Sequence, residues 1–490
     1  MITSLLPARL TSPYNEKNIL NLPIKNTRKR IASLYTTYND FMADHADYNL
    51  REARVGGFSF FILDDSTDPS VRRQVDLFAE ANRCKVCRRG TRQGYKAGAI
   101  NSWMKIYGSD YDYFFILDSD SRASADVIWH CADIARRDLD IAVIQTKTLT
   151  MTSAPTRLTR SSVTVQHAYM EIVQKAMKNL GTSPYYGHNA LIKVSALYSV
   201  GGFVEESNED YKTLARMYQK GYRSVYAESA VTWEEVPPDY LSARKRALRW
   251  SRDAVTQMSL LKYGGPEPVG FFLFYGWTTH MSNLALLLLL PTLTIASLPQ
   301  LFSNGTATIA GAMTISVIVL WPMLAVRIKD PELALRKMGS SLFWGSVYNI
   351  PMMAPVTWQI VKTSSSKLAA GLEYIFIGKM RTLKEEFVVT PKTRRVERSM
   401  LSVISKLKAE LAVGLGIICI AAISDHVISL VFAAPQVLSA MSLPILIYLE
   451  SRTSRGYHKN KATHIGHTPY YIPYLTYENL PSPAIQRMIR

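Results

Sequence analysis

The second half of the chain contains apolar stretches that are too long for a water-soluble domain to bury. Residues 271–298 and 306–326 are each long enough to cross a bilayer, which takes about 20 residues. Residues 411–424 and 427–449 form another apolar pair. The first half instead alternates charged and apolar runs. A chain of 490 residues exceeds one hydrophobic core, so we expect a soluble domain followed by a membrane domain.

The charge of the loops predicts how the apolar segments are oriented. Segments 327–337, 379–408 and 452–461 are basic and are expected on the cytosolic side. Segment 299–305 carries almost no positive charge and suits the opposite side. Segment 341–361 contains two prolines and is predicted to lie in the membrane interface or to re-enter. Four spans with both termini inside result; six is the alternative if this segment crosses twice.

The formal net charge of +18 requires an anionic partner, either a nucleic acid or a membrane surface. The basic residues gather beside the apolar segments, at 244–249 and 379–392. This placement favours the membrane and argues against nucleic acid. No secretory signal precedes the strand-like run 2–6, so the first half is expected in the cytosol.

The four cysteines are too few and too scattered for a disulfide framework. Cys84 and Cys87 form a single CxxC without a second pair or a nearby histidine. A structural zinc site takes four ligands, so both are expected on a strand instead.

Residues up to about 260 alternate between strand-like and helix-like runs. The predicted strands are 58–63, 85–88, 113–117 and 141–145, and the predicted helices are 70–81, 96–107 and 211–220. Continuous apolar strands alternating with helices are typical of a sheet covered on both faces. The sequence therefore predicts an α/β fold with a mixed or parallel sheet.

Carboxylates follow two of the predicted strands. Asp64 and Asp65 follow the first, and Asp118 and Asp120 end the strand 113–117. In parallel sheets ligands bind at the carboxyl ends of the strands, so these side chains are expected at one edge. Two carboxylates two residues apart can share a divalent cation with phosphates. Aspartates are also common turn formers, and for each motif both interpretations stay open.

Three further segments have a structural and a chemical interpretation. Lys96 opens a helix after a glycine-containing approach, and is either solvated or a phosphate contact. Asp210 precedes a helical run, and is either part of a cap or a general base. Arg249 and Trp250 lie in a basic helix before the first span. They either anchor an interfacial helix or bind a diphosphate and stack on a sugar.

In this order and spacing the motifs resemble processive members of glycosyltransferase family 2, whose pattern is D, DxD, TED and QxxRW. Segments 186–190 and 234–238 are similar to membrane glucosyltransferases of periplasmic glucan synthesis. Segment 387–392 resembles the gating loop of cellulose synthase catalytic subunits. The likeness spans nearly the whole chain. Asn208 replaces the threonine of TED, and Arg246 replaces the glutamine of QxxRW, which puts an acceptor contact in doubt.

The resemblance implies a GT-A-like nucleotide-sugar-binding domain followed by an α-helical transmembrane domain. We expect a cytosolic glycosyltransferase domain over 1–260 and a membrane domain over 261–450. The membrane domain would include the interfacial segment 341–361 and a cytosolic gating-loop region over 363–408. Residues 451–490 would form a basic cytosolic tail.

The resemblance also assigns roles. Asp64 or Asp65 would contact the uridine, Asp118 and Asp120 would bind the diphosphate with Mg²⁺ or Mn²⁺, and Asp210 would be the catalytic base. The further nucleotide-sugar-binding residues would be Lys96, Arg249, Thr390 and Lys392. The acceptor-binding residues would be Trp250, His188 and Asn189.

The implied activity is inverting, processive transfer from a UDP-sugar, UDP-glucose first among them, to a β-glucan that is moved across the membrane. The expected partners are the UDP-sugar, the growing polysaccharide and the lipid bilayer, with accessory export proteins as a further candidate and no nucleic acid. The expected location is the inner membrane, with several spans and a cytoplasmic catalytic domain. The alternatives are addition of one sugar to a lipid carrier and a non-catalytic membrane scaffold. The sugar, linkage, regulation and oligomeric state stay open.

Overall fold

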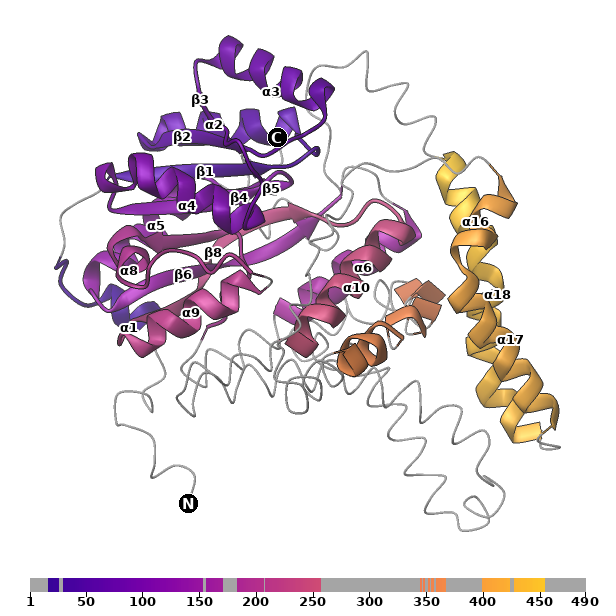
Figure 1. The fold of residues 1–490 in the computed structure, drawn as a ribbon. Coiled ribbons are helices and arrows are strands. Elements are labelled where there is room, and N and C mark those ends of the chain that lie inside the picture. Colours follow the sequence, from indigo (N-terminus) through magenta and orange to yellow (C-terminus); the bar gives the residue numbers. More distant parts are fainter. Residues whose placement is uncertain are drawn as a thin grey trace, which may run out of the picture.

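A computed structural model describes the α/β domain and part of the region that follows it (Figure 1). The described residues are 16–25, 30–152, 156–170, 183–206, 208–256, 344–345, 347–348, 351–352, 354–356, 358–366, 399–423 and 427–453. The predicted spans 271–298 and 306–326 lie outside them. So do Thr390 and Lys392 of the predicted gating loop.

One eight-stranded sheet forms the centre of the first domain, in the order β3-β2-β1-β4-β7-β6-β8-β5. The strands are β1 Ile31–Thr37, β2 Ser59–Asp64, β3 Lys85–Cys87, β4 Tyr113–Asp118, β5 Ser121–Arg122, β6 Ile141–Met151, β7 Ala190–Lys193 and β8 Arg223–Glu235. Strands β3, β2, β1 and β4 run parallel to their neighbours. β7 is antiparallel to β4 and β6, and β5 is antiparallel to β8. The sheet is therefore mixed rather than fully parallel.

Helices cover both faces of the sheet (Figure 1). The helices that cover the sheet are α1 Glu16–Leu20, α2 Ala43–Gly56, α3 Pro69–Asn82, α4 Tyr95–Tyr107, α5 Ala125–Arg137, α8 Val194–Ser199 and α9 Glu209–Gln219. Two further helices, α6 Arg157–Tyr169 and α10 Tyr240–Thr256, contribute Leu158 and Tyr240 to a third apolar cluster. Side chains alternate along the strands, so Tyr35 packs with α2 and α5 while Leu34 packs with α4 and α9. These two apolar layers confirm the α/β fold class.

Most predicted elements agree with the structure to within two residues, and the exceptions have a physical cause. β6 continues six residues beyond Gln145, because β8 pairs with it up to Met151 across an irregularity at Thr146 and Lys147. α9 begins at Glu209, so Asp210 lies in the first turn of the helix rather than before it.

The predicted apolar segments 411–424 and 427–449 are largely helical. They belong to α17 (Lys408–Ile423) and α18 (Val427–Thr453), which follow α16 (Met400–Lys406). Within the described residues, no helix combines the length and apolar content that a bilayer crossing requires.

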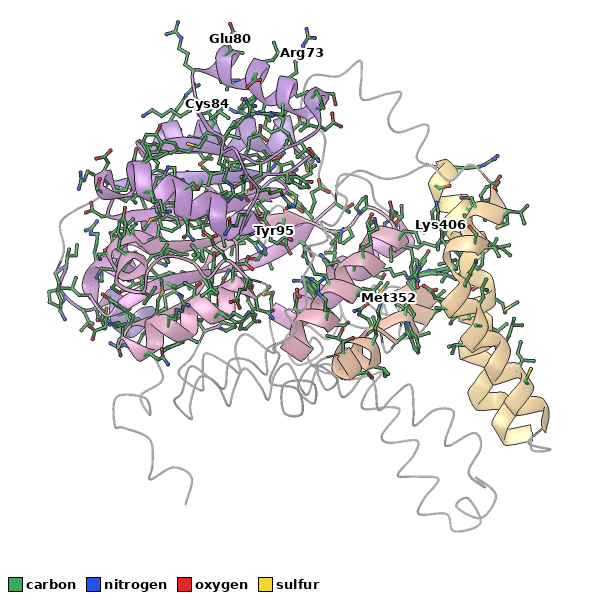
Figure 2. All side chains as sticks on the ribbon, viewed as in Figure 1. Arg73, Glu80, Cys84, Tyr95, Met352 and Lys406 are labelled. Carbon is green, nitrogen blue, oxygen red and sulfur yellow. The ribbon has the colours of Figure 1, made fainter. Side chains whose placement is uncertain are left out.

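Helix α10 connects the α/β domain with these later helices. Arg244 forms an ion pair with Glu410 of α17 (Nε to Oε1, 3.0 Å) and donates to the carbonyl of Lys406 at 2.6 Å. The Tyr240 hydroxyl donates to the same Glu410 oxygen at 3.3 Å. Tyr240 also belongs to an apolar cluster with Tyr348, Met352, Val403 and Leu407. Figure 2 labels Met352 of this cluster and Lys406, whose carbonyl Arg244 contacts.

We expect Glu410→Ala to destabilise the contact between α10 and α17 by about 3 kcal/mol, because removing one partner leaves a largely buried charge unpaired. The Glu410 side chain is fully buried and that of Arg244 is 19% exposed. Thermal unfolding of the purified chain measures the loss. Replacing both residues, as Arg244→Met with Glu410→Leu, should recover most of it. An unchanged melting temperature in Glu410→Ala would show that the pair does not support this packing.

Candidate active site

The two predicted carboxylate motifs flank β1 at the same edge of the sheet. Thr37 lies opposite Asp64 of β2, and Thr36 lies opposite Asp118 of β4. The Thr36 hydroxyl donates to Asp118 Oδ1 at 3.2 Å. The parallel register therefore brings both motifs to the carboxyl edge of the sheet, as the sequence predicts.

Asp64 and Asp65 occupy different environments. The Asp64 side chain is fully buried, and its Oδ2 accepts from Arg88 Nε at 2.7 Å. Asp65 forms a bidentate pair with Arg89 at 2.8 and 2.5 Å, and its side chain is 10% exposed. Both carboxylates are therefore paired with an arginine, and Asp65 is the one that keeps some exposure to solvent.

An arginine between two tyrosines, which the sequence did not predict, lies close to this edge. Tyr38 directly follows β1, and the Arg92 guanidinium lies 3.4 Å from the centre of its ring. The same guanidinium lies 4.8 Å from the ring centre of Tyr95, the first residue of α4. Together they provide flat, partly cationic surfaces next to Lys96.

The middle residue of the DxD motif holds its loop in place. Ser119 is buried, and its hydroxyl donates to Asp40 Oδ2 at 2.8 Å. The Tyr35 hydroxyl donates to the Ser119 carbonyl at 2.6 Å. Asp120 is also buried, whereas the Asp118 side chain is 29% exposed. The loop thus presents Asp118 at the surface on a rigid support.

Lys96 contacts the DxD motif directly. Its Nζ donates to Asp118 Oδ1 at 2.8 Å. The start of α4 is tightly wound, and a Cβ at Gly98 would lie 2.1 Å from the Gln93 carbonyl oxygen. Only glycine fits there, so the small residues that the sequence analysis noted serve to place Lys96 at the strand ends.

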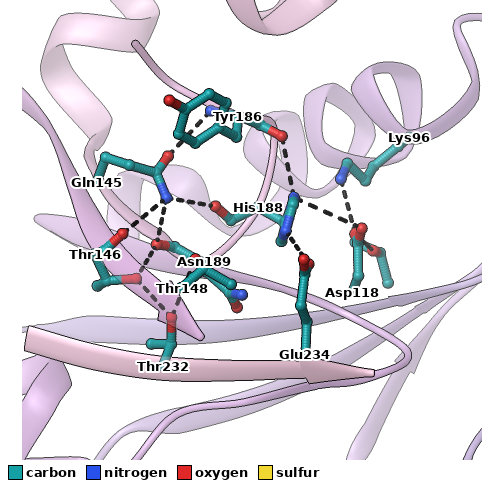
Figure 3. Close-up of polar contacts among 11 residues, drawn as sticks. Lys96, Asp118, Gln145, Thr146, Thr148, Tyr186, His188, Asn189, Thr232 and Glu234 are labelled. Carbon is teal, nitrogen blue, oxygen red and sulfur yellow. Dashed lines mark hydrogen bonds and ion pairs between the residues drawn. The ribbon is translucent and has the colours of Figure 1, made fainter. Parts of the chain in front are cut away.

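The segment Tyr186 to Asn189 is fixed by Gln145, a buried side chain of β6 (Figure 3). Gln145 Oε1 accepts from the Tyr186 amide at 3.0 Å, and its Nε2 donates to the carbonyls of His188 and Asn189 at 3.2 and 3.1 Å. Asn189 is fully buried, and its backbone amide donates to the Ile116 carbonyl. Its side chain lies beneath the surface, and its predicted contact with an acceptor sugar stays a prediction.

His188 points from this segment toward the DxD motif (Figure 3). Its Nε2 lies 2.6 Å from Glu234 Oε2, and its Nδ1 lies 3.0 Å from the Tyr186 carbonyl and 4.0 Å from Asp118 Oδ2. Burial lowers the pKa of His188, but the charges of Glu234 and Asp118 outweigh it and raise the pKa overall. His188 thus lies with the residues predicted to bind the donor, and its predicted acceptor contact stays a prediction.

Asp210 lies across from Lys96. A Cβ on Gly187 would be 3.5 Å from Asp210 Oδ2 and 3.8 Å from Lys96 Nζ, so both side chains border the backbone of Gly187, whose φ is +84°. Burial and then the charge of Glu209 raise the pKa of Asp210 to about 8. A carboxylate with a pKa near neutrality is suited to general base catalysis.

The carboxyl-terminal half of α10 reaches the same region. The Asn208 side chain donates to the Asp253 carbonyl at 2.7 Å, which joins α10 to the residues just before Asp210. Arg249 lowers the pKa of Asp253, although burial, the largest cause, raises that pKa to about 6. The predicted diphosphate ligand Arg249 is therefore close to the end of α10 that contacts α9.

Arg246, the residue that replaces the family glutamine, lies over Trp250, with its guanidinium 4.8 Å from the ring centre. Burial lowers the pKa of Arg246, and the charges of Glu234 and Asp120 oppose that effect. Trp250 is 48% exposed, so its ring is open to a ligand. Arg246 thus connects an exposed aromatic ring with the DxD loop, whose Asp120 acts on its charge.

The carboxylate oxygens at this edge suit a hard divalent cation that is also bound by the phosphates of a substrate. The described residues contain no group of three His, Cys, Asp or Glu side chains that could hold a metal by themselves. Mg²⁺ is typically bound by one or two carboxylates together with substrate phosphates. Asp118 and Asp120 provide that number of carboxylates at the edge where Lys96 already places positive charge.

Other residues of this site that were not predicted from the sequence include Thr36, Asp40, Gln145 and Glu234. Gln145 was detectable in principle, as a lone amide at the end of the apolar run 141–144. Glu234 begins a segment whose family likeness was noted, yet nothing in the sequence connects it with His188. That contact depends on the pairing of β8 within the sheet.

Comparison with known proteins agrees with this geometry. Residues 113–328 match the glycosyl transferase family group 2. Glucans biosynthesis glucosyltransferase H of Rhodopseudomonas palustris is 29% identical over 268 residues, which are 49% of this chain and 37% of that protein. Glucomannan 4-beta-mannosyltransferase 9 of Arabidopsis thaliana is 28% identical over 202 residues, 39% of this chain and 37% of that protein. The chain thus spans well under half the length of these relatives.

A solved mannosyltransferase from Pyrobaculum calidifontis, in complex with GDP-mannose and Mn²⁺, is 18% identical and has a TM-score of 0.39. The match covers 69% of this chain and 93% of that one. A score of this size does not establish a common fold, so the assignment depends on the sequence matches. Residues 113–328, which carry Asp118, Asp210 and Arg249, are a glycosyltransferase family 2 domain.

Proposed function

We propose that this protein transfers a sugar from a UDP-sugar to an acceptor hydroxyl with inversion at the anomeric carbon. The observation that supports this most strongly is the convergence at Gly187, where the Asp210 carboxylate and the Lys96 ammonium border one backbone position. Lys96 in turn contacts the DxD motif. In this proposal Asp210 is the base and Lys96 belongs to the diphosphate site, and their closeness would let both act on one sugar.

The chain's own residues account for each part of a single displacement. Asp210 takes the proton of the acceptor hydroxyl, whose oxygen attacks the anomeric carbon as the bond to the diphosphate breaks. Lys96 and Arg249 offset the charge that grows on the leaving diphosphate. Asp118 and Asp120 would hold Mg²⁺ or Mn²⁺, which would supply further positive charge to offset the charge on the leaving diphosphate.

The base of the nucleotide would lie at the Asp65 side of this edge. Asp65 is the more exposed of the two candidate carboxylates, and Tyr38 with Arg92 offers a flat surface nearby. Asp64 would support that part of the site from beneath, through its pair with Arg88.

The polymer and the membrane belong to the same proposal. The name of the Rhodopseudomonas palustris relative specifies a glucosyltransferase of glucan biosynthesis, which supports UDP-glucose as donor and a glucan as product. The name of the Arabidopsis thaliana relative specifies a 4-beta linkage, which supports a β-linked product. The basic segments beside the apolar ones support a cytoplasmic catalytic domain on an inner-membrane protein. Processive elongation, translocation through the spans, and a lid carrying Thr390 and Lys392 are further parts of the proposal.

The rate of transfer is expected to rise with pH up to about 8. Asp210 must be ionised to accept a proton, and burial with Glu209 raises its pKa to about 8. Below that pH most Asp210 is protonated, so the rate should fall about tenfold per pH unit. Initial rates between pH 5.5 and 9 measure this limb.

Glu209→Gln provides the control for the pH dependence. It removes the charge of Glu209, which after burial contributes most to the raised pKa of Asp210. The rise of the transfer rate should therefore occur at lower pH, while transfer itself continues. A rate that does not change between pH 6 and 8 would contradict the assignment of Asp210.

Membranes incubated with each radiolabelled UDP-sugar test the proposed function. A labelled polymer that a β-glucan hydrolase degrades is the expected product from UDP-glucose. A lipid-linked monosaccharide would instead support single addition to a carrier. Absence of UDP release with every donor would favour the non-catalytic scaffold.

A further inference from the structure

Strand pairing brings Glu234 next to the DxD loop. β8 pairs with β5, and Glu234 lies opposite Ser121, the residue that follows Asp120. The next residue, Glu235, donates its amide to the Asp120 carbonyl at 3.2 Å. The Glu234 side chain is only 13% exposed, so it is held within the structure rather than extended into water.

Glu234 fixes the orientation of the His188 ring (Figure 3). Its Oε2 lies 2.6 Å from His188 Nε2, while the Tyr186 carbonyl lies 3.0 Å from Nδ1. Because each ring nitrogen faces an acceptor, rotation of the ring would break a hydrogen bond. Gln145 fixes the backbone of the same segment from below. The imidazole is therefore held from both sides.

The two oxygens of Asp118 face different neighbours. Lys96 Nζ lies 2.8 Å from Oδ1, and His188 Nδ1 lies 4.0 Å from Oδ2. A shift of the His188 ring would thus change the surroundings of one Asp118 oxygen and leave the contact with Lys96 in place. Glu234 does not need to touch the substrate to influence how Asp118 is presented.

We propose that Glu234 is a positioning residue of the transfer reaction, which acts through His188 to orient the Asp118 carboxylate for the donor diphosphate and its divalent cation. The inference rests on the proposed function. Residues that orient a metal ligand typically change metal affinity or activity by about 10- to 100-fold when they are removed. His188 is the neighbour of the expected metal ligand Asp118, at 4.0 Å, and Glu234 acts one step further out by holding His188.

The test measures Mn²⁺ binding by electron paramagnetic resonance on the full chain in the presence of UDP, together with the KM for the UDP-sugar. Glu234→Ala should weaken Mn²⁺ binding about tenfold or more and raise the KM for the donor. Glu234→Gln keeps an oxygen that can accept from His188 and should recover most of the affinity. If Glu234→Ala does not fold, Glu234→Gln still tests the proposal, because it removes the charge and keeps the shape of the side chain.

Glu235→Ala is the matched control. Glu235 is the adjacent residue of β8, and its carboxylate faces His45 at 3.7 Å instead of His188. Because side chains alternate along a strand, its loss should affect stability without changing Mn²⁺ affinity. Equal losses of affinity in the two variants would indicate a general structural effect and overturn the proposal.

A double-mutant cycle decides whether Glu234 acts through His188. If it does, Glu234→Ala should cause no further loss of Mn²⁺ affinity in a His188→Ala background. Additive losses, or wild-type affinity in Glu234→Ala, would overturn the inference and leave the proposed function intact. A wild-type chain that binds no Mn²⁺ with UDP and transfers no sugar would overturn both.

Discussion

Asp210→Asn is expected to slow sugar transfer by about a hundredfold or more while leaving the binding of UDP nearly unchanged. Asparagine has almost the same shape as aspartate but cannot accept a proton from the acceptor hydroxyl. The replacement also removes a buried carboxylate whose pKa is raised by burial and by Glu209, so the fold should not be weakened. Single-turnover rates and UDP affinity, measured on the same preparation, separate the two effects.

Asp253→Asn is the matched control for this prediction. Asp253 is also largely buried, and burial raises its pKa to about 6, but it lies on α10 at the contact with Asn208. Its replacement should leave most of the transfer rate. If Asp210→Asn transferred sugar as fast as the wild type, a different group would have to take the proton.

Removal of divalent cations is expected to stop transfer, with a loss on the order of a thousandfold, because a metal ion typically contributes several kcal/mol to stabilising transition-state charge. Excess EDTA should abolish activity and added Mg²⁺ or Mn²⁺ should restore it. Replacing both Asp118 and Asp120 by alanine should cause the same loss without rescue. Both carboxylates are the expected ligands at the strand edge.

Ser119→Ala distinguishes metal binding from support of the loop. Ser119 lies between the two aspartates, but its hydroxyl contacts Asp40 rather than the exposed face. Its loss should reduce activity modestly and leave the response to Mn²⁺ intact. Full activity of the wild type in excess chelator would contradict the metal assignment.

Features encoded within one segment could be predicted from the sequence. β2 and β4 are apolar runs that end on aspartate, and their partner β1 brings both ends to the same edge. Position in a parallel sheet follows from chain order and strand direction, so the meeting of Asp64 and Asp118 was foreseeable. The start of α4 could be predicted in the same way, from the small residues before and after Lys96.

Features that depend on pairing between distant segments could not be predicted. The contact of Glu234 with His188 requires β8 to lie between β6 and β5, which no local pattern specifies. The burial of Asn189 follows from the insertion of β7 between β4 and β6. The different burial of Asp64 and Asp65 likewise depends on long-range packing, in which Arg88 pairs with the first and Arg89 with the second.

The anomeric configuration of the first product tests the central claim most directly. Proton NMR of the product formed from an α-linked UDP-sugar should show a β-linkage at the newly formed glycosidic bond. A single displacement inverts the anomeric carbon, because the acceptor attacks the face of the sugar opposite the leaving diphosphate. The β-linkage is therefore required if Asp210 activates the acceptor while Lys96 and Arg249 stabilise the diphosphate. An α-linked product would contradict the single displacement and, with it, the role of Asp210 as the base.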